Sequence, residues 1–321
     1  MIASYWARLA WIELACFFLI YLSAETLLAG AACRVVRLAE RFAPRSAARM
    51  LFWLRVSPLV LAVAAIAAVC MPSYVWLEAS GSREHVGWLC IGAGCGGGLV
   101  WLVCAGRLLQ NLARSRRYMA RWTHEGRRAQ LCENSTPAWV IGSDVPFLAL
   151  AGIVQPRLIA SRGLVRVLSP GQLNAAVGHE AAHQASHDNL KRLILRSIPR
   201  IVPFGGGMER IEHAWMKFAE RAADDWAVAG QAARALLLAE ALVRVARIGG
   251  AYASPLTAPL LADARELHAR VDRLVNPAPI PPVAGPSGRR TIWLGVGLFA
   301  AIAVGPAVLR AVHELLESLI R

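Results

Sequence analysis

The chain has 321 residues, of which 56% are hydrophobic and only 17% are charged, and its net charge is +14. Because a soluble domain carries about 25% charged residues, this composition indicates that part of the chain lies in lipid. The high hydrophobic fraction also excludes an intrinsically disordered chain.

Four stretches are long and apolar enough to cross a bilayer, which takes roughly 20 residues. They are residues 9–32, 51–71, 88–109 and 292–309. No basic segment precedes the first stretch and no clean cleavage site follows it, so we expect a retained helix and not a signal peptide. The sequence predicts a membrane region with three transmembrane helices in residues 1–109, and a fourth helix with a short tail in residues 292–321.

The positive charges gather after the first and third predicted spans. The first group consists of Arg34, Arg37, Arg41, Arg45 and Arg49, and the second of Arg114, Arg116, Arg117, Arg121, Arg127 and Arg128. The positive-inside rule places both groups in the cytoplasm. We therefore expect a multi-pass protein of the cell inner (cytoplasmic) membrane, whose charge sets its topology and attracts anionic headgroups of the lipid bilayer. No direct nucleic-acid binding is expected.

Polar and small residues inside the spans carry further expectations. Glu25 lies well within the first span, where an ionisable group is a functional candidate, although a packing partner on a neighbouring helix explains it equally well. The glycine-rich stretch 91–98 predicts close contact between helices. Arg55 lies near enough to the cytoplasmic end of the second span for its side chain to reach the interface.

Residues 110–276 are predicted to form one cytoplasmic domain. Apolar runs at 138–143 and 156–160 indicate short strands. The remaining pattern is helical, over residues 170–198, 207–229, 231–248 and 261–275. The Pro/Gly-rich segment 277–291 is an expected linker to the fourth helix. The fold class is thus mainly α, with an α+β domain between the third and fourth of about four transmembrane helices.

The central motif of this domain is the pair His179 and His183 with Glu180 between them. Residues four apart share one face of a helix, so the two imidazoles can bind one metal ion while Glu180 stands beside it. This is the HExxH arrangement of zinc hydrolases. Ser169 as an N-cap and Pro170 at the first helical position predict where this helix begins.

A catalytic zinc ion takes three protein ligands, so a third ligand must be found. His187 stands about 12 Å along the helix axis from His179, which is too far for the same ion. Ser186 and Asn189 occupy the positions where the metzincin subclass has glycine and a third histidine, so that subclass is excluded.

Glu220 is the remaining strong candidate. Glu220 and Asp224 again lie four apart on one helical face, so one carboxylate can ligate the metal while the second accepts the spare N–H of a ligating histidine. His213 lies about 10 Å from Glu220, too far for the same ion unless the helix breaks. The predicted zinc ligands are His179, His183 and Glu220.

The order of these motifs resembles the M56 family of membrane metallopeptidases, the family of the BlaR1 and MecR1 antibiotic-sensing receptors, with the M48 peptidases as broader relatives. The resemblance runs from Pro146-Phe147 through Gln155-Pro156-Arg157 to the residues 179–183 and Asp188-Asn189-Leu190. It continues at Glu220-x-x-x-Asp224, with Ala223 where the family frequently has Cys, and at Arg270–Leu274. Only about a dozen residues follow the fourth predicted helix, so we do not expect the penicillin-binding sensor of those receptors.

The resemblance implies a zincin-like domain and a zinc-dependent endopeptidase that acts on a protein or peptide substrate. One zinc ion would polarise the scissile carbonyl and acidify water, and Glu180 would serve as the general base and acid. Asp224 is expected to orient a histidine ligand, and Asp188 to hold the helix against the domain.

Three functions remain open from the sequence. The first is cleavage of a cytosolic or membrane-proximal regulatory protein, such as a transcriptional repressor or the chain itself, in signal transduction. The second is a signal-transducing membrane protein whose zinc domain has little or no turnover. The third is membrane protein quality control, as in M48 relatives.

Overall fold

The computed structural model describes residues 2–73, 87–132, 137–153, 155–202, 206–249 and 264–276. Its three longest helices are α1 (Ile2–Ala39), α2 (Pro44–Ala65), which continues into the π-helical turn η1 (Ile66–Cys70), and α4 (Trp88–Glu125). The structure confirms that three of the predicted spans lie in helices long and apolar enough to cross a membrane. The fourth predicted span and the linker 277–291 lie outside the described residues.

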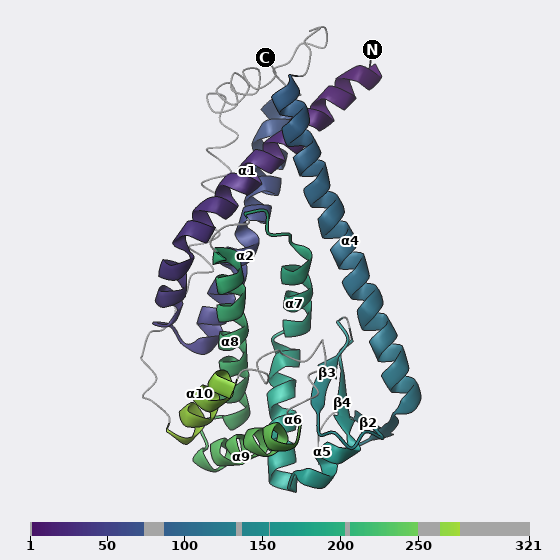
Figure 1. The fold of residues 1–321 in the computed structure, drawn as a ribbon, viewed down its shortest axis with the longest axis vertical. Coiled ribbons are helices and arrows are strands. Elements are labelled where there is room, and N and C mark those ends of the chain that lie inside the picture. The colour runs from purple at the N-terminus through teal and green to yellow at the C-terminus, as the bar shows by residue number, and fades with distance from the viewer. Residues whose placement is uncertain are drawn as a thin grey trace.

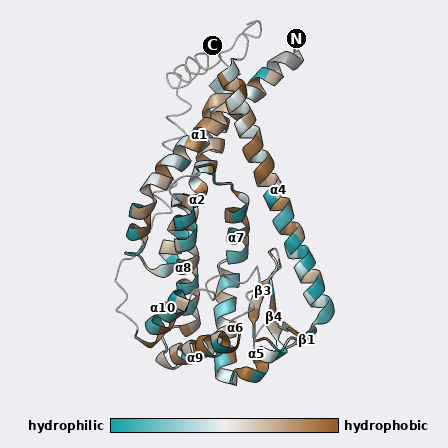
Figure 2. Cartoon of the chain, in the orientation of Figure 1, coloured by the Kyte–Doolittle hydropathy of each residue, from teal (hydrophilic) through white to brown (hydrophobic). Residues whose placement is uncertain are grey.

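Helices α1 and α4 cross at one end of the molecule and diverge toward the other (Figure 1). At the crossing, a Cβ atom on Gly97 would overlap the Leu14 carbonyl oxygen, and one on Gly94 would overlap the Trp11 ring. The predicted packing role of this glycine-rich stretch is confirmed. In Figure 2 the brown, hydrophobic residues dominate α1, α2 and α4 toward the crossing, whereas the far half of α4 is largely teal.

Two helices of the following segment run between the diverging spans (Figure 1). They are α7 (Asp188–Ser197) and α8 (Gly207–Val228). The spans and α8 share one hydrophobic core, in which Tyr21 of α1 and Leu51 of α2 are clustered with Trp215 and Phe218 of α8. The helix that carries Glu220 is therefore held by the membrane helices.

Charged residues of the spans also contact this helical pair. Arg55 is fully buried, and its Nε lies 2.7 Å from Glu212 Oε1 on α8. The prediction that Arg55 reaches the lipid interface is wrong, because α8 supplies a carboxylate partner inside the protein. Glu25 is also buried, and its carboxylate accepts a hydrogen bond from the Ile201 backbone N–H at 3.1 Å. Glu25 thus has a packing partner in the α7–α8 connection.

A four-stranded mixed sheet has the order β1-β2-β4-β3. Its strands are β1 (Arg127–Ala129), β2 (Ala138–Ile141), β3 (Leu148–Ala151) and β4 (Arg157–Ser161). Strand β2 pairs parallel with β4, and β3 pairs antiparallel with β4, with Leu150 opposite Leu158. The two predicted strands are confirmed as β2 and β4. Strands β1 and β3 were not predicted, because neither contains a β-branched or aromatic residue.

The prediction of a single helix over residues 170–198 is wrong, because the structure has two helices there. The chain leaves the helical path at Ser186–His187, where His187 adopts a left-handed conformation with φ 54°. This break ends α6, and α7 begins at Asp188. The helices after β4 are α5 (Arg162–Val167), α6 (Pro170–Ala185), α7, α8, α9 (Ala232–Gly249) and α10 (Ala264–Val275). The other predicted helices correspond to α8, α9 and α10.

Candidate active site

Helix α6 supplies the two histidines. Ser169 and Gln172 form both hydrogen bonds of a capping box at its first turn, and Pro170 is its first residue, as the sequence predicts. His179 and His183 follow one turn apart on the inner face, and both are buried. Their Nε2 atoms lie 3.2 Å apart. The register of α6 therefore brings one nitrogen of each ring to a common point.

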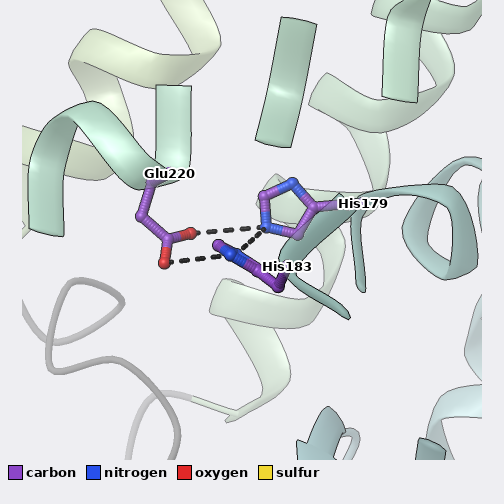
Figure 3. A group of neighbouring side chains, drawn as sticks. All are labelled: His179, His183 and Glu220. Carbon is purple, nitrogen blue, oxygen red and sulfur yellow. Dashed lines mark hydrogen bonds and ion pairs between the residues drawn. The ribbon is translucent and has the colours of Figure 1, made fainter. Parts of the chain in front are cut away.

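Helix α8 brings Glu220 to the same point. Its Oε2 lies 3.3 Å from His179 Nε2, and its Oε1 lies 3.5 Å from His183 Nε2. Figure 3 shows the carboxylate facing both imidazoles. Within the described part of the chain, these three residues are the group of His, Cys, Asp or Glu side chains placed to hold a metal ion.

The donor set fits a zinc ion. Zinc prefers tetrahedral sites with Zn–N and Zn–O bonds of about 2.0–2.2 Å, which separate neighbouring ligand atoms by about 3.3–3.6 Å. The distances between the Nε2 atoms of His179 and His183 and the Glu220 oxygens are 3.2, 3.3 and 3.5 Å. Two imidazoles and one carboxylate are also a catalytic zinc set that leaves one position open.

Two aspartates contact the other nitrogen of each ring. Asp188 Oδ2 lies 2.7 Å from His183 Nδ1, and Asp224 Oδ1 lies 3.0 Å from His179 Nδ1. Such contacts fix the tautomer and the ring orientation of a metal-ligating histidine. The expected place of Asp224 agrees with this geometry. Asp188 was also expected beside the metal ligands, and it reaches His183 directly from the first turn of α7.

Two arginines complete the surroundings of the acidic residues. Arg270 of α10 forms a bidentate pair with Asp224, at 2.9 and 2.7 Å, and its Nη1 lies 3.2 Å from Glu220. Arg192 of α7 donates to Glu220 Oε1 at 3.1 Å. From the sequence, Arg270 was noted only as part of the family resemblance, and Arg192 was not singled out. Neither contact could be predicted, because both depend on how α7 and α10 pack against α8.

The protonation of this cluster follows from its opposed charges. Burial lowers the pKa of His183, but the Glu220 charge and the Asp188 hydrogen bond outweigh burial and raise that pKa to about 10. Burial raises the pKa of Asp224, but the Arg270 charge and the His179 hydrogen bond lower it to about 2. Without a metal ion the imidazoles hold protons between carboxylates. A divalent cation can replace those protons.

Glu180 lies between the histidines and the edge strand β3. Its Oε2 accepts the Leu150 backbone N–H at 3.1 Å, and its charge contributes to the raised pKa of His183. Asn189 of α7 donates to the carbonyl oxygens of Leu150 and Gly152 at 2.8 and 2.9 Å. Because these backbone groups of β3 point away from β4, they form the open edge of the sheet.

Two other histidines stand apart from the metal group. His187 lies beyond the end of α6 and bonds the Gln184 carbonyl oxygen, and His213 is exposed on α8. Helical spacing along the sequence already placed both histidines too far away to bind the same metal ion. The break after α6 gives a second reason for His187, since it removes this residue from the face that carries His179 and His183.

The fold and the site define a membrane-associated metallopeptidase. Residues 140–271 match the model of Peptidase family M48, and this range includes α6, α8, strands β3 and β4 and the second half of β2. This part of the chain is therefore similar to the metallopeptidases of that family. No curated protein matches the chain, and no solved structure matches it.

Proposed function

We propose that this chain is a membrane-bound zinc-dependent endopeptidase of the M56 type. It cleaves a cytosolic or membrane-proximal regulatory protein, such as a transcriptional repressor or the chain itself, in signal transduction. The observation that carries the proposal is the convergence of His179, His183 and Glu220 beside Glu180 and the open edge of β3. The order of motifs along the sequence supports the M56 type.

Each residue has a proposed part in the reaction. His179, His183 and Glu220 would hold the zinc ion, which supplies a Lewis acid that polarises the scissile carbonyl and acidifies water. Glu180 takes the proton of the attacking water at a carboxylate oxygen and delivers it to the leaving amine. Asp188 and Asp224 keep the two imidazoles in the ligating orientation.

The substrate is proposed to add as a strand to the open edge of β3. In the structure, the Leu150 N–H on that edge bonds Glu180, and Asn189 bonds the Leu150 carbonyl oxygen. A peptide backbone that pairs with Leu150 would replace these side chains. Its arrival would free Glu180 for proton transfer.

The domain is proposed to face the cytoplasm of the inner membrane. Arg37 at the end of α1 and Arg45 at the start of α2 lie at the ends of the spans on the same side of the molecule as the domain (Figure 1). This arrangement supports the topology expected from the positive-inside rule. A reporter fused after Arg128 should be active only in the cytoplasm, and an extracytoplasmic reporter would contradict the orientation.

The match to the M48 model favours a second candidate, a membrane protease for protein quality control. The substrate range separates the two candidates. A regulatory protease is expected to cut few proteins at defined sites, whereas a quality-control protease is expected to cut many unfolded membrane proteins.

The test is cleavage by the full chain, zinc-loaded and reconstituted in lipid nanodiscs. Mass spectrometry identifies the fragments released from added protein substrates. It also compares the fragments in total protein from cells that express each variant. Glu180→Gln should lower the cleavage rate about 10²- to 10⁴-fold. Glu209→Gln is the matched control, because Glu209 is an exposed residue on α8 away from the metal group. Equal cleavage rates for the wild type and Glu180→Gln would contradict the proposed protease activity. They would favour a signalling domain without turnover.

A further inference from the structure

A cavity of about 310 Å³ lies beside the candidate active site, between α4, α7 and the end of β3. Three arginines line it: Arg114 from α4, and Arg192 and Arg196 from α7. Leu150 and Gly152, whose backbone groups form the open edge of β3, line its other wall. Its volume is at the small end of ligand-binding pockets, which suits one side chain or headgroup better than a whole cofactor.

Helical spacing explains why the arginines meet. Arg192 and Arg196 lie four residues apart and Asn189 lies three before Arg192, so all three share one face of α7. Arg114 and Tyr118 are also four apart on α4, and both line the cavity. The two helices pack against each other, and the side chains of Arg114 and Arg196 remain exposed to solvent where they line the cavity.

The positive charge in this cavity is largely unbalanced. Arg192 donates one bond to Glu220, but its buried Nε has no hydrogen-bond partner. In the described ranges, neither Arg114 nor Arg196 forms an ion pair with a carboxylate. Burial and the neighbouring charge of Arg192 lower the pKa of Arg196, against the opposing effect of the Glu212 charge. Among the described residues, only Arg192 of these three guanidinium groups contacts a carboxylate, so the site favours an anion.

The cavity also adjoins the proposed path of the substrate. Leu150 bonds Glu180 through its N–H, and its carbonyl oxygen and that of Gly152 bond Asn189 at the cavity wall. Arg192 connects the cavity to the metal group, because it contacts Glu220. A peptide that lies along β3 would therefore pass the cavity.

We propose that this cavity is a specificity subsite that binds the carboxylate of an aspartate or glutamate side chain in a peptide substrate. The inference rests on the proposed peptidase function and adds a substrate class to it. The contribution of β3 to the cavity wall favours a peptide over a lipid headgroup. Arg114 and Arg196 bind the acidic side chain, while Arg192 stays on Glu220.

The test uses quenched fluorescent peptides of one sequence, amidated at the C-terminus so that only side chains vary. One Glu is moved along the peptide, and each Glu peptide is paired with its Gln counterpart. The zinc-loaded full chain is assayed in nanodiscs of neutral lipid. The wild type should prefer Glu over Gln at one position by about tenfold in kcat/KM. The Arg114→Gln/Arg196→Gln double variant should lower this ratio to about 1, and Arg196→Glu should favour Lys at that position.

Arg116→Gln is the matched control, because Arg116 is an exposed arginine of α4 that lies about 200° around the helix from Arg114. It should keep the tenfold ratio. Binding of the same peptides to the zinc-loaded Glu180→Gln chain, measured by fluorescence anisotropy, should show the same Glu preference in Kd. This readout tests the subsite even if no peptide is cleaved, an outcome that would count against the proposed function and not against the subsite.

Two results would contradict the proposal that this cavity binds an acidic side chain of the substrate. One is equal binding and cleavage of Glu and Gln peptides at every position, or a preference that persists in the double variant. The other is stimulation by anionic lipid that the double variant loses while its peptide ratio stays at the wild-type value. That second result would assign the cavity to a lipid headgroup.

Discussion

Arg55 of α2 and Glu212 of α8 form an ion pair, 2.7 Å between Nε and Oε1, that joins a membrane helix to the helix carrying Glu220. Glu212 precedes Glu220 by eight residues, which is about 12 Å along the same helix. Arg55 also donates to the Ile198 carbonyl oxygen at 3.2 Å. The position of a metal ligand therefore depends on contacts made within the membrane region.

Replacing Arg55 alone should strongly destabilise the protein. Arg55→Met removes the buried partner of the Glu212 carboxylate, which keeps a 3.8 Å contact with Arg200, and breaking a buried pair costs at most about 3–5 kcal/mol. Thermal unfolding in detergent should show a clear fall in Tm. The double variant Arg55→Met/Glu212→Met should recover much of that fall, because no unpaired charge remains. Strictly additive losses from the two single changes would contradict a direct interaction.

Replacing Asp224 should weaken zinc binding without removing a proposed ligand. Asp224→Asn loses the carboxylate that faces His179 Nδ1, and changes of this kind cost about 10- to 100-fold in metal affinity. Zinc affinity is measured by competition with a chelator. Asp225→Asn is the control, since Asp225 is partly exposed and pairs with Arg273. Equal affinities for both variants would contradict the orienting role of Asp224.

The pH dependence of the metal-free protein follows from His183. Its pKa is raised from 6.5 to about 10, so its stabilising contribution is complete below pH 6.5 and is lost as the pH rises toward 10. The slope is at most about 1.4 kcal/mol per pH unit for one proton. Tm should fall from pH 6.5 to 9.5 without zinc, and His183→Ala should reduce the slope. A metal-free Tm that rises over this range would contradict the raised pKa.

The HExxH helix and both carboxylates of the second helix could be predicted from the sequence, because spacing along a helix fixes which side chains share a face. The break at His187 could not, since a non-glycine residue rarely adopts a left-handed conformation. Strands β1 and β3 contain no β-branched or aromatic residue, so the sequence carried no strand signal there. As a result, two contacts could not be predicted from the sequence. They are the contact of Asp188 with His183 and the hydrogen bond from Leu150 of β3 to Glu180.

The contact between α1 and α4 should not tolerate a larger side chain at Gly97. A Cβ atom there would overlap the Leu14 backbone, which cannot move as a side chain can. Gly97→Leu should separate the helices and lower Tm by several degrees, as overpacking costs about 1–3 kcal/mol. Gly98→Leu is the matched control, because a Cβ at Gly98 meets nothing within 4 Å. Equal Tm losses for the two variants would contradict this packing.

The central claim is that α6 and α8 hold one zinc ion jointly. Zinc K-edge X-ray absorption of the zinc-loaded full chain tests it most directly, together with the zinc content after dialysis. The account predicts one zinc ion per chain, with two imidazole nitrogens and carboxylate oxygen at about 2.0–2.2 Å, and a changed spectrum with weaker retention in Glu220→Ala. A chain that retains no zinc, or a spectrum that Glu220→Ala leaves unchanged, would contradict it.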